Sequence, residues 1–386
     1  MGAIPKVALL VETSNAYARG LLSGIMSYIR EHRSWSIYLG EHSRGERLPS
    51  WLSQCQADGA IVRIENAAIA AIVRQLKVPV VDMSAARLIP ALAWVETDDL
   101  ATARLAADHL LERGFKHFAF AGDNHHNWSR WREQHFTSLI QEAGCDCSVY
   151  HGSPIDKRDS EVLLEEIGTW IAGLPKPLGV MAAYDLYGQQ VLNACRRRAI
   201  QVPDEVAVIG VDNDEIFCNL SDPPMSSVIP NTHRTGYEAA ALLDRMMAGE
   251  SVRGEGRLFE PLGVATRQST DVLAIEDRNL VQAIRYIRQH ACEGISVKAV
   301  LNAMPQSRRM LEVRFKKTIG RTPHEEIVRV QLNQVKMLLV ESDLSLEQIA
   351  GRSGFSHVEY LSAVFRDKVG MPPGRYRALN RRKRMI

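Results

Sequence analysis

Polar side chains suited to binding a hydroxylated small molecule follow the apolar runs of the first 270 residues. They stand after KVALLVE, HFAFAG, LGVMAAY and VAVIGV and are Ser14, Asn15, Tyr17, Arg19, Asp123, Asn124, Trp128, Arg130, Arg132, Glu133, Asp185, Asp212 and Asn213. Carboxylates and amides exchange hydrogen bonds with hydroxyls, Arg donates in a planar fork, and an aromatic ring covers the apolar face of a pyranose. The set predicts a sugar-binding site, although any single Asp or Asn here also fits a helix cap or a turn.

A second set of charged residues lies near the end of the chain and suits a polyanion. Residues 280–386 contain 20 Lys and Arg against 9 Asp and Glu, a net charge of +11, whereas residues 1–279 contain 27 against 36, a net charge of −9. A basic segment attached to a larger acidic body is typical of a nucleic-acid-binding module. Because basic tails are often only solubilising, charge alone leaves DNA binding open.

The basic segment contains an internal repeat with an offset of 50 residues. Residues 311–323 (LEVRFKKTIGRTP) align with residues 361–373 (LSAVFRDKVGMPP), with a Leu, a Phe, a basic residue, a Gly and a Pro in register. Leu and Phe four positions apart share one helix face, Gly ends the helix in a left-handed conformation, and Pro prevents its continuation. The repeat therefore predicts two similar helical units.

Capping residues predict where the helices of both units begin. The three expected capping boxes are Thr322 with Glu325, Ser345 with Gln348, and Ser356 with Glu359. In the second unit a short helix over Leu346–Arg352, a turn at 353–354 and a new helix predict a helix-turn-helix. The first unit has the same plan with its turn at 303–306, and an amphipathic helix over 325–340 is expected to join the two units.

The apolar runs of the first 270 residues are continuous rather than alternating. They are residues 6–11, which we expect to be the first strand, and GAIVRI, VPVVDM, HFAFAG, LGVMAAY and VAVIGVD. Continuous runs are typical of strands buried on both faces of a parallel sheet, and the helical stretches between them predict an open α/β fold. Ligands bind beyond the carboxyl ends of such strands, which is where the polar side chains stand.

The chain from about residue 280 to residue 376 resembles the DNA-binding domain of the AraC family. The stretches that carry the resemblance are SRRMLEVRFKKTIGRTP and IAGRSGFSHVEYLSAVFRDKVGMPPGRYR. The resemblance implies an all-α, double helix-turn-helix domain of seven helices. Its recognition helices, over 307–318 and 357–368, would enter successive major grooves of double-stranded DNA.

Residues that face away from the repeated Leu and Phe are candidates for contacts with DNA. The candidates for base contacts are Arg308, Arg309, Glu312, Val313, His357, Val358, Glu359, Ser362 and Ala363. The candidates for phosphate contacts are Arg314, Lys316, Lys317, Arg366 and Lys368. Any one Arg could instead be a solvated surface residue, Glu359 is also a capping-box acid, and 381–384 are expected to form a loose basic tail. Val313 and the turn at 303–306 make the first recognition helix the less typical of the two. We therefore expect the second recognition helix to contribute more of the sequence preference.

Residues 5–270 resemble the type I periplasmic-binding-protein fold of the LacI family of repressors. The passages that carry the resemblance are TDDLATARLAADHLLERGFKHFAFAGD and VPDEVAVIGVDNDEIFCNLSDPPMSSVIPN. The resemblance implies an α/β sensor of two lobes, and Asp185 and Asp212 fall on positions that contact sugar in that family. Two departures are the expected absence of a helix-turn-helix before the first strand and of a secretion signal.

A LacI-like sensor followed by an AraC-like reader resembles a family of xylose-responsive transcription activators, as do the stretches SNAYARGLLSGIMSYIR and DNDEIFCNLS. This resemblance implies D-xylose or a related pentose as the effector. The matching positions are Asn15, Tyr17, Arg132, Glu133, Asp185, Asp212 and Asn213. A different sugar, and repression instead of activation, stay open.

The expected organisation is an effector domain over 1–270, a linker over 271–279 and a DNA-binding domain over 280–386. The fold family implies three crossovers between the lobes, which we place near 113–117, 228–233 and 257–261. Sugar binding would close the cleft and rearrange a homodimer, and an activator would also contact RNA polymerase.

Several other classes of protein are disfavoured. The sequence has no GxGxxG after the first strand, no phosphate-loop GKS or GKT and no GxSxG, so we expect neither catalysis nor a cofactor. Cys145 and Cys147 lack a second pair at zinc-ligand spacing, so no metal is expected. No apolar run reaches the length of a membrane span, and we expect a cytoplasmic protein with reduced cysteines.

Overall fold

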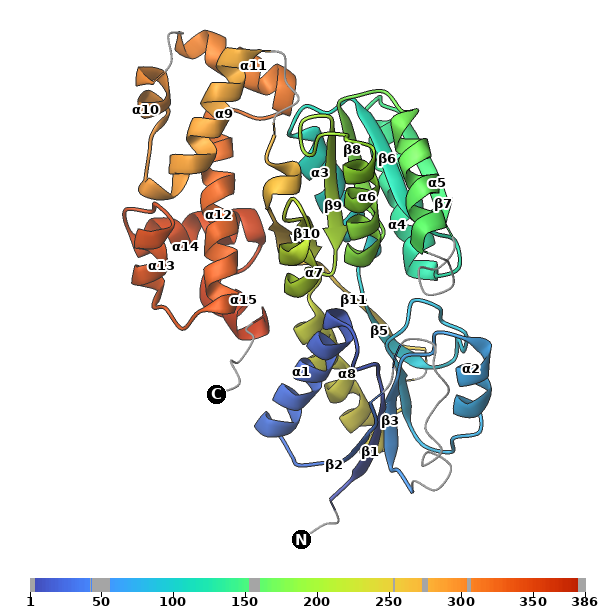
Figure 1. Ribbon diagram of the computed structural model, residues 1–386. Coiled ribbons are helices and arrows are strands. Elements are labelled where there is room, and N and C mark those ends of the chain that lie inside the picture. Colours follow the sequence, from blue (N-terminus) through green and yellow to red (C-terminus); the bar gives the residue numbers. More distant parts are fainter. Residues whose placement is uncertain are drawn as a thin grey trace.

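The computed structural model describes residues 4–41, 43, 56–152, 160–252, 254–272, 277–303 and 307–380. The described chain forms two α/β lobes, one above the other in Figure 1, and an all-helical domain beside them. This confirms the fold predicted from the sequence, a two-lobed periplasmic-binding-protein-like sensor followed by helix-turn-helix units. None of the described helices is long and apolar enough to cross a membrane.

The first lobe is built on a parallel sheet. Its strands are β1 (Lys6–Leu10), β2 (Ser36–Leu39), β3 (Gly59–Val62), β4 (Val80–Asp82), β5 (Ala93–Thr97) and β11 (Gly256–Phe259). Its helices are α1 (Ala16–Glu31), α2 (Ala67–Val73) and α8 (Thr232–Met247). The strand order is β11-β5-β4-β3-β1-β2. Helices α1 and α8 pack tightly against each other, because a Cβ at Gly24 would lie 2.0 Å from the carbonyl oxygen of His233.

The second lobe repeats this plan with one antiparallel edge strand. Its strands are β6 (His117–Asp123), β7 (Cys147–Gly152), β8 (Leu178–Ala182), β9 (Val206–Val211), β10 (Ser226–Ile229) and β12 (Gly263–Ala265). Its helices are α3 (Asp99–Leu111), α4 (Asn127–Glu142), α5 (Ser160–Ala172), α6 (Asp185–Arg197) and α7 (Glu215–Leu220). The order is β12-β10-β9-β8-β6-β7, and only β12 runs antiparallel to its neighbour. Strands β8 and β9 are fully buried, as their continuous apolar sequences predicted.

Among the described residues the chain passes between the lobes three times. It does so between β5 and α3, between β10 and α8, and between β11 and β12. The predictions near 228–233 and 257–261 are confirmed, but the prediction near 113–117 is wrong. Residues 113–117 connect α3 to β6 inside the second lobe, and the true crossover lies at 97–99. The error arose because α3 packs on the second lobe through small side chains, and its amphipathic pattern does not say which lobe it covers.

The remaining described chain forms seven α-helices, the number implied by the family resemblance. They are α9 (Arg278–His290), α10 (Val297–Asn302), α11 (Arg308–Ile319), α12 (Pro323–Glu341), α13 (Leu346–Arg352), α14 (Val358–Val369) and α15 (Pro373–Asn380). The repeated apolar pairs each enter a separate core: Leu311 and Phe315 in one, Leu361 and Phe365 in the other. Helix α12 runs through both cores and joins the two units.

The observed caps confirm most of the predicted boundaries. Gly320 and Gly370 end the recognition helices α11 and α14 in the left-handed conformation, at φ of 75° and 78°. Capping boxes occur at Thr322, with Pro323 at the first helical position, and at Ser345. The box predicted at Ser356 is wrong: the N-cap of α14 is the next residue, and no side chain there caps the helix.

Three predictions fall wholly or partly outside the described residues. They concern 273–276 of the linker, 304–306 of the first turn and the basic tail at 381–384. The domain boundaries at 270 and 280 stay a prediction. The 3₁₀ helix η3 (Gln268–Thr270) is buried against the second lobe, through Ser269 and Thr270.

Candidate effector pocket and DNA-binding face

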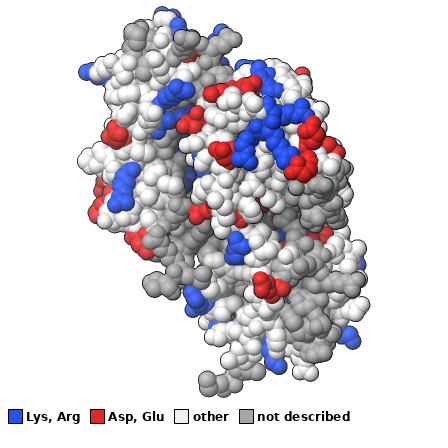
Figure 2. All heavy atoms as spheres, viewed as in Figure 1, with Lys and Arg blue, Asp and Glu red and all other residues white. Residues whose placement is uncertain are grey.

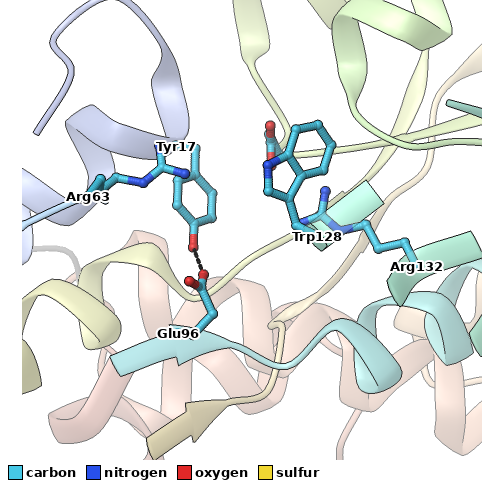
Figure 3. Close-up of a pocket in the computed structure, with 6 residues that line it drawn as sticks. Tyr17, Arg63, Glu96, Trp128 and Arg132 are labelled. Atoms are coloured by element: carbon cyan, nitrogen blue, oxygen red, sulfur yellow. Dashed lines mark hydrogen bonds between the residues drawn. The ribbon is translucent and has the colours of Figure 1, made fainter. Parts of the chain in front are cut away.

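A cavity of about 20 Å³ lies where the carboxyl ends of the two parallel sheets face each other. Figure 3 shows Tyr17 and Arg63 on one side of it, Trp128 and Arg132 on the other, and Glu96 below Tyr17. The described residues that line it are Tyr17, Arg63 and Glu96 from the first lobe and Trp128, Arg132 and Asp212 from the second. Each lobe thus supplies one aromatic residue, one Arg and one carboxylate to the same small space.

Tyr17 is presented by the first turn of α1. Asn15 caps this helix, because its side chain accepts a hydrogen bond of 2.8 Å from the backbone N–H of Ala18. The Tyr17 hydroxyl lies 2.8 Å from Glu96 Oε1 and 2.8 Å from Thr97 Oγ1, both on β5. Asn15 therefore positions the start of α1, while Tyr17 itself faces the pocket.

Arg63 follows β3 and is buried under the pocket. Its guanidinium donates to Glu12 Oε2 at 2.9 Å and to Glu65 Oε1 at 2.5 Å, and lies 5.2 Å from the ring centre of Tyr17. Burial alone would lower the pKa of Arg63, but the charges of Glu12 and Glu65 raise it well above its usual range. The guanidinium is therefore a fixed positive charge. The sequence prediction missed it because GAIVRI was taken as a single strand, although Arg63 stands just past its end.

Glu96 was also missed, because it lies inside the strand β5. Burial raises its pKa to about 8, with Arg63 opposing the shift and Asp99 adding to it. One oxygen accepts the Tyr17 hydroxyl, and the other, Oε2, is buried without a hydrogen-bond partner among the described residues. A charged residue within an otherwise apolar strand is the signal that could have identified this site, since a buried carboxyl needs a partner.

Arg132 and Trp128 come from the first two turns of α4. Arg132 Nε donates to Asp99 Oδ1 at 2.7 Å, and its Nη1 donates to the carbonyl oxygen of Ala183 at 2.7 Å. The guanidinium lies 5.3 Å from the ring centre of Trp128. Burial opposes its charge, but Asp99 and then Asp212 raise the pKa of Arg132. The second lobe thus offers a fixed cation beside an indole ring.

Asp212 follows β9 with a φ of 106°, which aims its side chain back to the pocket. The other predicted effector residues are bonded elsewhere. Asp185 accepts from the backbone of Asp214 at 2.7 Å and from Ser227 Oγ at 2.6 Å. Asn213 accepts a hydrogen bond of 2.9 Å from Arg267. The Glu133 carboxylate lies 2.8 Å from Nε2 of His151. Of the seven predicted residues, the structure therefore brings Tyr17, Arg132 and Asp212 together at the pocket.

Helix α11 presents most of its predicted DNA contacts to solvent. Arg308, Arg309, Val313 and Lys316 are exposed, and Glu312 pairs with Arg308 at 2.9 Å. Lys317 is exposed as well, whereas Arg314 pairs with Asp277 at 2.9 Å. The face opposite Leu311 and Phe315 therefore points outward, as the repeat predicted.

Helix α14 presents a similar face. His357, Glu359, Ala363 and Arg366 are exposed, Ser362 is half-buried, and Lys368 is exposed beside Asp367. Val358 packs against the apolar core of the second unit, so its side chain is less accessible than the prediction assumed. Whether each of these residues touches DNA stays a prediction.

The charged residues of the sensor surface form a different kind of pattern. Figure 2 shows Lys and Arg mixed with Asp and Glu on the outer face of the second lobe, over α5 and α6. The pairs there include Arg197 with Glu161 and Arg198 with Glu165. Such mixed exposed pairs are typical of a solvated surface.

Three family models match the chain in the order of these domains. They are a XylR N-terminal domain over residues 6–100, a periplasmic binding protein-like domain over residues 107–270 and a helix-turn-helix domain over residues 300–379. The junction of the first two models falls near the first crossover between the lobes. The third covers α11 to α14.

Whole-length relatives share the same architecture. The xylose operon regulatory protein of Escherichia coli K12 is 32% identical over 385 residues, covering 97% of each chain. That of Haemophilus influenzae is 30% identical over 380 residues, covering 96% of this chain and 98% of the relative. The solved structure of the xylose-binding transcription activator XylR is 30% identical with a TM-score of 0.64, covering 98% of this chain and 99% of that one.

A two-lobed sensor with a polar pocket, joined to a double helix-turn-helix domain, defines a DNA-binding transcription regulator. The chain belongs to the family of xylose operon regulatory proteins.

Proposed function

We propose that this protein binds D-xylose, or a closely related pentose, between its two lobes and that the sugar controls binding of its C-terminal domain to double-stranded DNA. The pocket lined half by each lobe carries this proposal. Its two fixed guanidiniums, its carboxylates and the Trp128 ring provide the donors, acceptors and apolar face that a pyranose needs. The 30% identity to XylR, a xylose-binding transcription activator, supports the choice of sugar.

The size of the cavity indicates how the sugar would act. A cavity of about 20 Å³ has room for one water, whereas small-molecule sites have volumes of roughly 300–1,000 Å³. Entry of a sugar therefore requires the lobes to separate at their three crossovers, followed by closure around the ligand. Only a difference in sugar affinity between the two arrangements can shift their populations.

Several features of the function extend beyond the pocket. The protein acts in the cytoplasm, where its DNA is, and as a homodimer, because a single reader seldom reaches enough specificity for a genome. As a relative of the transcription activator XylR, it recruits RNA polymerase once bound to DNA. Six of the predicted effector residues, all but Glu133, and the eleven predicted DNA contacts are part of this proposal, with Arg63, Glu96 and Trp128 added to the first group.

Isothermal titration calorimetry of the purified chain with D-xylose, L-arabinose, D-ribose and D-glucose tests the effector. We expect D-xylose to bind most tightly. Replacing Asp212→Asn removes a charge at the pocket and keeps the side-chain shape, and Asn tolerates a positive φ. Because a hydrogen bond to a charged group contributes about 1.5–3 kcal/mol, xylose affinity should fall about 10–100-fold.

Glu133→Gln is the matched control, because Glu133 lies on α4 beside Arg132 but pairs with His151 away from the pocket. Its xylose affinity should equal that of the wild type. Absence of binding by every aldose would overturn the sugar proposal, and equal losses in both variants would overturn the assignment of the pocket.

A further inference from the structure

The sensor and the DNA-binding domain are joined by a cluster of charged side chains at the end of α3. Glu112 is the C-cap residue of α3, and its side chain is 11% exposed. One carboxylate oxygen accepts from Arg321, which stands just before α12, and the other lies 3.1 Å from the guanidinium of Arg329 within α12. The sensor thus supplies a carboxylate to two cations of the DNA-binding domain.

A second carboxylate completes the cluster from inside the DNA-binding domain. Glu326 is 1% exposed and accepts from Arg329 at 2.8 and 2.9 Å, from Arg321 at 3.2 Å and from Arg288 at 3.4 Å. Burial alone would raise its pKa, but these guanidiniums lower the pKa to about 2. Glu326 therefore stays ionised and holds the three arginines together, so that Glu112 binds an assembled cationic site.

Helix α3 connects this cluster directly to the effector pocket. Its first residue, Asp99, accepts the hydrogen bond from Arg132, which lines the pocket, and its last turn leads into Glu112. A helix of 13 residues is about 20 Å long and moves as one body. A displacement of Arg132 or Asp99 on sugar binding is therefore transmitted to Glu112.

The DNA-binding domain has its other attachment at the hinge itself. Asn380 at the end of α15 bonds to Asn231 at 2.5 Å, and Leu379 accepts from Arg234 at 3.4 Å, at the crossover between β10 and α8. Leu262, in the crossover between β11 and β12, packs against the core of the second helix-turn-helix unit. Rotation of the lobes about these crossovers moves Glu112 relative to the contacts of Asn380, Leu379 and Leu262, which lie at the crossovers themselves.

The two arginines held by Glu112 also belong to a groove beside the second recognition helix. This groove, with a volume of about 750 Å³, lies between α12 and α14, and its lining includes Arg321, Arg329, Lys336 and Lys368. Guanidiniums in such a position suit the phosphates of DNA, which bind Arg in the same bidentate way as a carboxylate does. Glu112 and a DNA phosphate therefore compete for the same side chains.

We infer that the Glu112 contact is an autoinhibitory latch. In the arrangement seen here it holds the junction of α11 and α12 against the sensor and occupies two guanidiniums of the DNA-binding domain. The lobe movement that accompanies sugar binding shifts α3 and withdraws Glu112, so that Arg321 and Arg329, still positioned by Glu326, can bind a phosphate of DNA in its place. This inference rests on the proposed control of DNA binding by a sugar, and it assigns the residue that carries the control.

Replacing Glu112→Gln in the full chain tests the latch. The probe is a fluorescent duplex selected from a random pool by the wild-type protein in the presence of D-xylose, and the readout is fluorescence anisotropy with and without the sugar. Allosteric couplings typically amount to about 5–150-fold, so without sugar the variant should bind DNA about tenfold more tightly than the wild type. With saturating D-xylose the two proteins should bind equally.

Glu161→Gln is the matched control, because Glu161 pairs with Arg197 on the exposed face of the same lobe. It should leave the DNA affinity unchanged with and without sugar. Hydrogen–deuterium exchange adds a readout independent of the DNA probe. Amides of residues 320–329 should exchange faster in Glu112→Gln than in the wild type, and to the same extent as in wild type bound to D-xylose.

The outcomes separate the latch from the function on which it rests. If the wild type responds to D-xylose but Glu112→Gln has wild-type DNA affinity and wild-type exchange without sugar, the latch is overturned and the proposed function stands. If the wild type neither binds D-xylose nor changes its DNA affinity, the proposed function fails first. A variant that loses its cooperative thermal transition would show Glu112 to be a structural contact, which also overturns the latch.

Discussion

The effector pocket and the DNA-binding face use the same kinds of residue in opposite environments. In the pocket, the Arg63 and Arg132 side chains are 4% and 5% exposed, and each is fixed by carboxylates. On the DNA-binding face, the Arg308 side chain is 70% exposed and its one described ion pair is with Glu312 on the same helix. The pocket is therefore organised before its ligand arrives, whereas the DNA-binding face is organised by its ligand.

This difference determines what a substitution costs in each region. Removing one partner of a buried ion pair leaves the other charge without compensation in a medium of low polarity, so stability falls. Removing an exposed Arg changes stability little, because water already solvates it. Losses on the DNA-binding face should appear in affinity and in salt dependence instead.

The largest expected effect is the loss of stability on Arg63→Ala. This change removes the guanidinium to which both Glu12 and Glu65, with side chains 4% and 5% exposed, are bonded. Breaking such a buried pair typically costs about 3–5 kcal/mol, and denaturation in urea would measure it. Arg308→Ala is the matched exposed variant and should lose less than about 0.5 kcal/mol. Equal losses in the two variants would remove the distinction between the regions.

The next effect is a dependence of stability on pH that Glu96 should cause. Its pKa rises from 4.5 to about 8 on folding, so the folded protein holds the proton more tightly than the unfolded chain does. Stability should therefore fall as pH rises from about 4.5 to about 8, and level off above. Glu96→Gln, which resembles the protonated side chain, should be more stable than the wild type at about pH 9 by on the order of 1–4 kcal/mol.

The same two proteins should unfold with similar midpoints well below pH 4.5, where Glu96 is protonated in both the folded and the unfolded wild type. Thermal denaturation across this pH range measures the difference. If the difference in midpoint between the wild type and Glu96→Gln does not increase with pH, Glu96 is ionised in the folded protein at neutral pH.

A smaller effect is expected for DNA binding on Arg309→Ala. A contact between Arg and a guanine contributes about 1–3 kcal/mol of discrimination, so affinity should fall and the preference for one base should relax. Ser362→Ala on α14 should relax a preference at the other half of the site. Sequencing of selected DNA pools measures both changes. If Arg309→Ala changed the preference more than any substitution on α14, the expectation that the second helix is the stronger reader would be wrong.

Much of the fold could be predicted because its signals are local. The helix α13 begins and ends at the predicted residues, since Ser345 and Gln348 form its capping box. The glycines at the ends of α11 and α14 are in the predicted conformation, and the continuous apolar runs are the buried strands. Each of these features depends on residues close together in the sequence.

The features that could not be predicted depend on contacts between distant segments. Arg63 follows β3 and Glu96 lies within β5, and only the order of the sheet, with β4 between these two strands, shows that both reach Tyr17. Glu133 lies beside Arg132 in the sequence, yet the turn of α4 directs it to His151 on β7. The contact of Glu112 with Arg321 joins two domains, and no local pattern marks it.

The most direct test of a sugar-controlled DNA-binding domain is the affinity for the selected duplex, measured by anisotropy with and without D-xylose, in the wild type and in Asp212→Asn. We expect D-xylose to tighten DNA binding by the wild type. At a sugar concentration that saturates the wild type but not the variant, Asp212→Asn should respond far less. An equal response in the two proteins would contradict control of DNA binding from this pocket. So would a wild-type protein that binds D-xylose without any change in its affinity for DNA.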